Sequence, residues 1–429
     1  MIKRSKLLLL FFCIGGQYQA LYAQNGTIIS IEECYALARE NYPLIKKHDL
    51  IRSSSGFSLA NASKLYLPQL VVSGQASYQS QTINFSDAIP AVPGVNLPSI
   101  SKDQYKVQAE INQIIFDAGD IRNQKAVIKA NEAVQQQSIE VNLRELKNRV
   151  NQIYFAIILM DEQLKQNEIR KSEFQSQLNK TQAALTNGTA FRSNVDQLKA
   201  ELINADMSSI EFKSNRAAYL QMLSVMIDKK LDSETRLSVP GEQQIAAFIN
   251  RPELELYDLQ KRLYDVEERK LKIAYTPKLS AFIQGAYGRP TLNIIENKFG
   301  PWFVTGLRLN WNLGSLYALK NNRQILHNNR QHVDVDKEVF VYNTTLTLSQ
   351  QNGEIQKFSD LITQDKLVID LRESVKKSSQ AQFENGVITI HEYISQLNSE
   401  NTARQTMILH NIQRLEAQYK HNHISGDEN

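Results

Sequence analysis

Cysteine, long apolar runs and net charge are all scarce in this sequence of 429 residues. Its only cysteines are Cys13 and Cys34, and Cys13 lies in a leader that we expect to be removed, which excludes an internal disulfide. Beyond residue 23 no segment is apolar over 18 residues, so we expect no transmembrane helix. Cys34 is then expected to be a small buried side chain of an amphipathic helix.

The first residues have the pattern of a leader. Lys3, Arg4 and Lys6 precede the apolar run Leu7–Ile14, and a plausible cleavage site stands before Gln24. Residues 1–23 are therefore predicted to be a secretory signal peptide, and the mature chain is predicted to be exported. Without the three leader cations the formal net charge falls from +4 to +1, which gives no electrostatic case for binding nucleic acid.

Motifs that carry covalent chemistry are also missing. The sequence has no His-Glu-x-x-His, no Gly-x-Ser-x-Gly, no phosphate-binding glycine loop and no paired cysteines. His421 and His423 fall in a polar C-terminal stretch, where we expect frayed tail histidines rather than metal ligands. We therefore expect no enzyme, no catalytic residue, no metal site and no cofactor, and any energy for transport has to come from a partner.

What the sequence does contain is an internal repeat. "ARENYPLIKKHDL" (38–50) matches "AFINRPELELYDL" (247–259), and "YLPQLVVSGQASY" (66–78) matches "YTPKLSAFIQGAY" (275–287), both at a constant offset of 209 residues, as from Pro43 to Pro252. Each copy then runs through a helical stretch to an Asn-Gly pair. Two copies of one unit, in the same order, make up the mature chain.

Four stretches of about ten residues alternate between apolar and polar side chains. They begin near Leu70, Tyr105, Leu279 and Thr305. The alternation fits strands of an outer-membrane barrel, and it fits half of a soluble sandwich equally well. The signal peptide and the absence of an apolar helix favour the membrane. Four strands cannot close a barrel, since spanning barrels begin at about eight strands, so several chains must combine their strands.

The remainder is predicted to be long helix. From Asp120 to about Leu185 a continuous helix would extend ~100 Å, too far for a compact domain, so it must project. Apolar residues along it keep the alternating four- and three-residue spacing of a coiled-coil seam. The seam consists of Ile139, Leu143, Leu146, Val150, Ile153, Ile157, Met160 and Leu164.

Each long helix is predicted to reverse at an Asn-Gly pair, because glycine tolerates the left-handed conformation that ends helices. These pairs are Asn187-Gly188 and Asn385-Gly386. Capping-box patterns then open new helices, Ser193-x-x-Asp196 in the first copy and Thr389-x-x-Glu392 in the second. The two breaks are therefore read as the tips of two helical hairpins.

These tips resemble those of the TolC-like outer-membrane efflux proteins, which read roughly Gly, five variable residues, Asp, Val. The matching positions are Asn194 and Val195 in the first copy and Glu392 and Tyr393 in the second. "SIEECYALARENYP" (30–43) is similar to the N-terminal helix of that family, and "FDAG" (116–119) to its strand-to-helix turn. With the duplication, the resemblance extends over nearly all of the mature chain.

The resemblance implies a mainly helical α+β fold, in which coiled-coil hairpins form an α-barrel and four strands per chain join a trimeric 12-stranded β-barrel. It implies a homotrimer in the lipid of the outer membrane of a Gram-negative bacterium, with a helical tunnel in the periplasm. The implied partners are a periplasmic adaptor and an inner-membrane pump. The implied function is an exit duct for tripartite efflux or type I secretion; the alternative is a non-conducting structural or adhesive coiled-coil trimer.

Glu392 has two possible roles. As the capping partner of Thr389 it is structural, which the complete local pattern favours. As the acid of the family's tip position it would recur three times around the axis and form a pore constriction. The predicted docking tips consist of Asn187, Gly188, Ser193, Asn194, Val195, Asn385, Gly386, Thr389, Glu392 and Tyr393.

The expected division of the chain follows from these patterns. The first copy has periplasmic helices over 24–67, a strand pair over 68–118 and a hairpin over 119–228 with its tip near 187–195. A linker over 229–250 leads to the second copy. That copy has a helix over 251–276, a strand pair over 277–313, a hairpin over 314–419 with its tip near 385–393, and a polar tail over 420–429.

Overall fold

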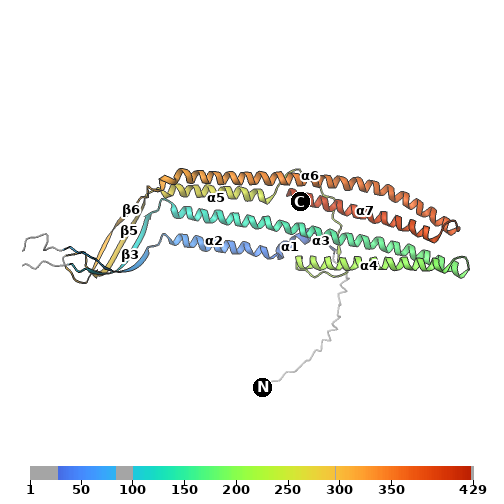
Figure 1. Ribbon diagram of the computed structural model, residues 1–429, viewed down its shortest axis with the longest axis horizontal. Coiled ribbons are helices and arrows are strands. Elements are labelled where there is room, and N and C mark those ends of the chain that lie inside the picture. Colours follow the sequence, from blue (N-terminus) through green and yellow to red (C-terminus); the bar gives the residue numbers. More distant parts are fainter. Residues whose placement is uncertain (1–27, 84–99, 295, 427–429) are drawn as a thin grey trace, which may run out of the picture.

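The protein is described here from a computed structural model, which describes residues 28–83, 100–294 and 296–426 (Figure 1). The predicted signal peptide, residues 1–23, lies outside these residues. A four-stranded sheet stands at one end of the elongated chain and two helical hairpin tips stand at the other (Figure 1). The predicted long projecting hairpins are thus present in the structure.

The helices account for most of the length. In chain order they are α1 (Ile31–Asn41), the short 3₁₀ turn η1 (Pro43–Ile45), α2 (Lys46–Lys64), α3 (Asp120–Thr186), α4 (Arg192–Ile227), α5 (Pro252–Ala274), α6 (Ser315–Glu384) and α7 (Ile390–Ser425). With 67 and 70 residues, α3 and α6 each extend ~100 Å. In the part of the chain that the structure describes, no helix combines the length and apolar character needed to cross a membrane.

Each copy of the repeat contributes two neighbouring strands to the sheet. These are β2 (Gln69–Tyr78), β3 (Asp103–Phe116), β5 (Lys278–Arg289) and β6 (Gly300–Asn310), all antiparallel, in the order β2-β3-β5-β6. The pairing of β3 with β5, in which Ile111 lies opposite Ile283, joins the two copies. Strands β2 and β6 are the edges.

The two faces of this sheet differ in a way that separates the barrel from the soluble sandwich. The apolar face is the exposed one: Val72 is 67% exposed, Phe303 72% and Leu307 68%. Lys106, Gln108 and other polar residues alternate with them on the opposite, partly sheltered face. A sandwich buries its apolar face against a second sheet, and in the described residues nothing covers this one. The apolar face therefore suits contact with lipid.

The main core lies midway along the molecule, where the start of the chain meets α3. The predicted seam is present: Val150 and Ile157 are fully buried, and the other seam residues are buried or half-buried. The Tyr154 hydroxyl lies 2.9 Å from the Ile29 carbonyl oxygen, beside the two-residue parallel pairing of β1 (Ile28–Ile29) with β4 (Arg236–Leu237). Cys34 is buried as expected, and burial raises its thiol pKa to about 12, so it stays a thiol.

The C-terminal stretch differs from the prediction. We expected a polar tail from residue 420, but α7 continues to Ser425 and His421 is only 2% exposed. The polar residues here bond to the 229–250 linker: the Asn422 side-chain amide donates to the Gln244 carbonyl at 2.8 Å. A polar sequence is thus ordered by partners that lie about 180 residues away. The fourth strand also ends earlier than expected, at Asn310 rather than Leu313.

Candidate functional site

The two hairpin tips reverse direction with the same backbone geometry. Gly188 and Gly386 have φ values of +73° and +72°, in the left-handed region. In each tip the amide of the residue after the glycine donates to a carbonyl five residues back, from Thr189 to Ala184 and from Val387 to Gln382. These bonds satisfy carbonyls that a helix end would otherwise leave open. The Asn-Gly breaks therefore form the predicted turns.

The helix that leaves the second tip begins with the predicted capping box. The Thr389 hydroxyl accepts from the Glu392 amide at 3.2 Å, and the Glu392 carboxylate accepts from the Thr389 amide at 2.7 Å. These bonds to Thr389 hold the pKa of the Glu392 carboxyl below its ordinary value. Glu392 is therefore an exposed carboxylate whose geometry is fixed by its capping role.

The first tip lacks this box, and the prediction for Ser193 is wrong in that respect. Helix α4 begins at Arg192, two residues earlier than a cap at Ser193 requires, with Phe191 at the N-cap position and no side-chain cap. Ser193 therefore stands inside the first turn. Asp196 lies 3.9 Å from Arg192, both of them exposed, instead of closing a box. The local pattern was present, but the helix start had shifted by two residues.

The residues that match the family's tip positions differ in exposure. Val195 is 2% exposed and Tyr393 is 5% exposed, so both support the tip from within. Tyr393 stacks on Phe383 with ring centroids 5.7 Å apart. Asn194 is half-buried, whereas Glu392 is exposed. The chain thus places Asn187, Gly188, Ser193, Asn385, Gly386, Thr389 and Glu392 on the tip surface, and Val195 and Tyr393 beneath it.

Two exposed apolar side chains stand at the tips. Phe191 is 77% exposed and Val387 is 70% exposed. The sequence shows Phe191 directly before its helix, but it gives no sign that Val387 points outward while Ile390, three residues later, is buried. Single exposed apolar side chains are common on protein surfaces, so these two are noted for their position at the tips rather than for the area they expose.

Below the tips a polar layer links the two hairpins. Arg170 of α3 donates to Glu201 of α4 at 3.1 Å and to Asn398 of α7 at 2.8 Å. Lys376 of α6 lies 2.8 Å from Glu173 of α3 and 3.4 Å from the buried Glu400. Because these contacts join helices of both hairpins, they hold the two tips at a fixed spacing.

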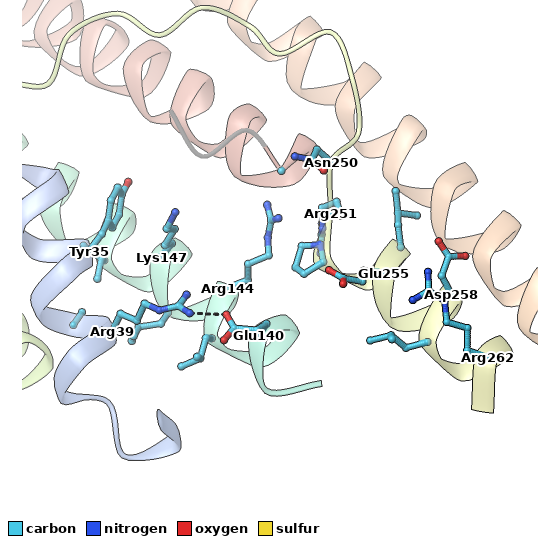
Figure 2. A pocket seen from close by; sticks show the side chains of 18 residues that line it. Tyr35, Arg39, Glu140, Arg144, Lys147, Asn250, Arg251, Glu255, Asp258 and Arg262 are labelled. Carbon is cyan, nitrogen blue, oxygen red and sulfur yellow. Dashed lines mark hydrogen bonds and ion pairs between the residues drawn. The ribbon is translucent and has the colours of Figure 1, made fainter. Parts of the chain in front are cut away.

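A cavity of about 460 Å³ lies farther up, between α1, α3 and α5 (Figure 2). Arg39 reaches across its wall to Glu140 at 2.7 Å. Just beyond it, burial and the nearby charges of Arg144 and Arg251 lower the pKa of His423 to about 4, so this histidine is neutral. In the described part of the chain no group of three or more histidine, cysteine or acidic side chains is placed to hold a metal ion. The cavity is a joint between the two copies of the repeat.

Comparison with known proteins gives a match to one family model and a shared fold. Residues 18–227 match the model of the outer membrane efflux protein family. No curated protein matches the sequence. Among solved structures, the fold is similar to CusC, with a TM-score of 0.67, 14% identity and coverage of 93% of this chain and 92% of that one.

Two further structures are similar at comparable coverage. The outer membrane channel CmeC of Campylobacter jejuni has a TM-score of 0.62 and 12% identity over 92% of this chain and 85% of its own. The outer membrane protein VceC of Vibrio cholerae has a TM-score of 0.64 and 9% identity over 92% of this chain and 96% of its own.

These likenesses confirm the predicted fold class. The chain is mainly helical and internally duplicated, and its four strands are its share of a trimeric barrel. The predicted resemblance is confirmed as well. The protein is located in the outer membrane, with its helical tunnel in the periplasm.

Proposed function

We propose that this chain, a TolC-like outer-membrane efflux protein, is the exit duct of a tripartite system. Three copies form one channel, the hairpin tips dock on a periplasmic adaptor, and substrates pass from an energised inner-membrane pump to the exterior. The observation that carries the proposal is the open four-stranded sheet, apolar and exposed on one face and polar on the other.

The sheet requires partners because its edges are open. Among the described residues, β2 pairs with β3 alone and β6 pairs with β5 alone. In lipid an unpaired edge leaves backbone groups unsatisfied, at a cost of several kcal/mol each. Joining β6 of one chain to β2 of the next satisfies both edges, and three chains give twelve strands, above the minimum of about eight for a closed barrel.

The helical part offers matching edges. Helix α4 packs on α3, and α6 packs on α7 and α5, so α4 and α6 are outer helices of the chain (Figure 1). Helix α4 exposes Ile203, Met207 and Ile210, which lie 11 to 18 residues above its start at Arg192. Helix α6 exposes Leu367, Leu371 and Val375, which lie 9 to 17 residues above its end at Glu384.

These two apolar stripes stand at nearly equal heights above the tips, because both helices rise about 1.5 Å per residue. Packing α4 of one chain against α6 of the next would cover both stripes at once. The threefold rotation that places α4 of one chain beside α6 of the next would also place β2 beside β6 and so close the sheet into a barrel. We therefore take the exposed stripes as the contact between chains rather than as docking sites for another protein.

Planar-bilayer recording tests the duct directly. Purified trimers should carry ionic current in steps of uniform size, and native mass measurement in a detergent that preserves folded barrels should give three chains. A trimer without current would support the structural or adhesive alternative. A monomer in that detergent would contradict the shared barrel.

Adaptor docking has its own test at the tips. The paired variants Phe191→Ser and Val387→Ser remove the exposed apolar side chains without touching the turn glycines. We expect weaker binding to the purified adaptor and unchanged thermal stability and current. Ile169→Ser, an exposed position on α3 away from the tips, is the matched control. If the tip variants bound the adaptor as tightly as the wild type and the Ile169→Ser control, Phe191 and Val387 would not belong to the docking interface.

A further inference from the structure

The polar face of the sheet carries few charges, and their arrangement is specific. On this face Glu110 of β3 lies opposite Gln284 of β5, and Lys106 lies four residues before Glu110 on the same strand. By the same alternation, the charged positions on this face of the four strands are Lys106, Glu110, Lys278 and Arg308. In a closed barrel this face lines the lumen, so these side chains set the charge of the duct where it crosses the membrane.

Two of the cations are neutralised. Lys278 lies 2.5 Å from Asp120, at the helical end of the sheet. Arg308 on β6 reaches across β5 to Glu110 on β3, at 2.9 Å. Within the described residues Lys106 forms no ion pair, and the four strands place no other acid on this face. Each chain therefore contributes one net positive charge to the wall.

The long reach of Arg308 is held by its neighbours. Its guanidinium lies over the ring of Phe282, 4.5 Å from the ring centroid. The face of an aromatic ring is partly negative, so it attracts the positive charge of the arginine. Gly306 opposite leaves room for that ring, since an added Cβ would stand 3.3 Å from it. The Arg308 side chain therefore lies along the barrel wall, and its charge is paired with Glu110 instead of pointing into the lumen.

We infer that the barrel section of the duct favours anionic solutes over cationic ones, with three copies of Lys106 as the cause and Glu110 limiting the effect. This inference rests on the proposed trimeric duct. Twelve strands about 4.8 Å apart and tilted by about 40° enclose a backbone cylinder roughly 25 Å wide. The axis then lies within about 10 Å of the lysine charges, close to the Debye length at 0.1 M salt.

The experiment is the reversal potential of single trimers in a gradient of potassium chloride around 0.1 M. Lys106→Gln brings the wall to zero net charge per chain, and we expect the chloride-to-potassium permeability ratio to fall about two- to fivefold. Glu110→Gln releases Arg308 and should raise the ratio by a similar factor. Lys298→Gln, which removes a cation from the loop after β5, is the control and should leave the ratio unchanged.

Salt gives a second check on the cause. In 1 M salt the Debye length falls to about 3 Å, so the differences between variants should shrink toward none. Currents with the same ratio in the wild type, Lys106→Gln and Glu110→Gln would overturn the inference and leave the duct standing. No current from any of the trimers would overturn the duct, and this inference with it.

Discussion

The two hairpin tips share one turn but differ in how the next helix begins and in what supports it. Both turns place glycine at a φ near +73° and close the same amide-to-carbonyl bonds. After the turn, the second tip forms a full capping box, whereas the first begins its helix at Arg192 with no side-chain cap. Beneath the tips the contrast is between Tyr393 and Val195.

The comparison teaches which parts of a duplicated unit are constrained. Only glycine reverses a helix this sharply without strain, so both copies need it at the same place. A helix start can instead be satisfied by a side chain, by water or by a partner, so the capping residues are free to differ. We therefore expect the second tip to be the more stable of the two and the first tip to open more easily.

The largest difference should appear when the buried supports are truncated. Tyr393→Ala removes a buried, stacked ring and should lower the free energy of local opening by about 3–5 kcal/mol. Val195→Ala removes two buried methyl groups and should lower it by about 2 kcal/mol. Hydrogen exchange at each tip measures the free energy of local opening. Equal losses of opening free energy at both tips would show that Tyr393 and Val195 stabilise their tips to the same extent.

Replacing the turn glycines should affect the two tips alike. Gly188→Val and Gly386→Val each force a β-branched residue into the left-handed region, at a cost of about 1–2 kcal/mol or more. Gly353→Ala is the control, because Gly353 lies inside α6 with open space around it, and alanine should there stabilise by about 0.5–1 kcal/mol. If one turn tolerated valine, the shared geometry would not be required at that tip.

A smaller contrast is expected at the helix starts. Thr389→Ala removes a cap that is present and should destabilise the start of α7 by about 1 kcal/mol. Ser193→Ala removes a side chain that caps nothing and should change the opening of α4 by less than about 0.5 kcal/mol. A loss at Ser193 as large as at Thr389 would mean that the first tip forms a box in solution.

The smallest effect is the pH dependence of the second tip. Because the folded state lowers the pKa of Glu392, its carboxylate contributes stability above the ordinary glutamate pKa of about 4.3. That contribution is lost as the pH falls through the lowered folded value. Glu392→Gln keeps a capping side chain but should lose this acid-dependent loosening of α7, measured by hydrogen exchange between about pH 5 and 3.

Glu392→Gln also separates the two roles of the residue. If the three carboxylates form a constriction, the variant should alter conductance or cation selectivity at neutral pH with little change in opening free energy. Unchanged currents would leave Glu392 a cap. The first tip offers no counterpart, since Asn194 is neutral at the matching position.

Much of this architecture could be predicted because it is written in local patterns. Alternation gave the strands to within a few residues, the apolar seam gave α3, and the Asn-Gly pairs gave the turns. The resemblance to the efflux family added the number of chains. These features depend on residues close in sequence, where side-chain periodicity and glycine geometry act directly.

The predictions failed where contacts between residues far apart in the sequence determine the structure. Nothing near His421 indicates burial, yet α7 continues there because the linker supplies partners such as Gln244. The cap expected at Ser193 had a valid pattern, but the helix began at Arg192. Val387 and Ile388 have similar side chains, and only packing against the opposite hairpin determines which of them is exposed.

The pairing of β3 with β5 has a consequence for how the chain matures after export. Between these strands lie all of α3, α4 and α5, so β5 reaches the periplasm only after more than 150 intervening residues have been released. Closing so long a loop is slow and costly unless its ends are already near each other. Helix α5 packs along α3, and the start of β5 lies next to the end of β3, where Leu279 is opposite Phe116. We therefore expect the helical hairpins to pack first and to bring the two strand pairs together, so that the membrane-facing sheet is the last part of the chain to form.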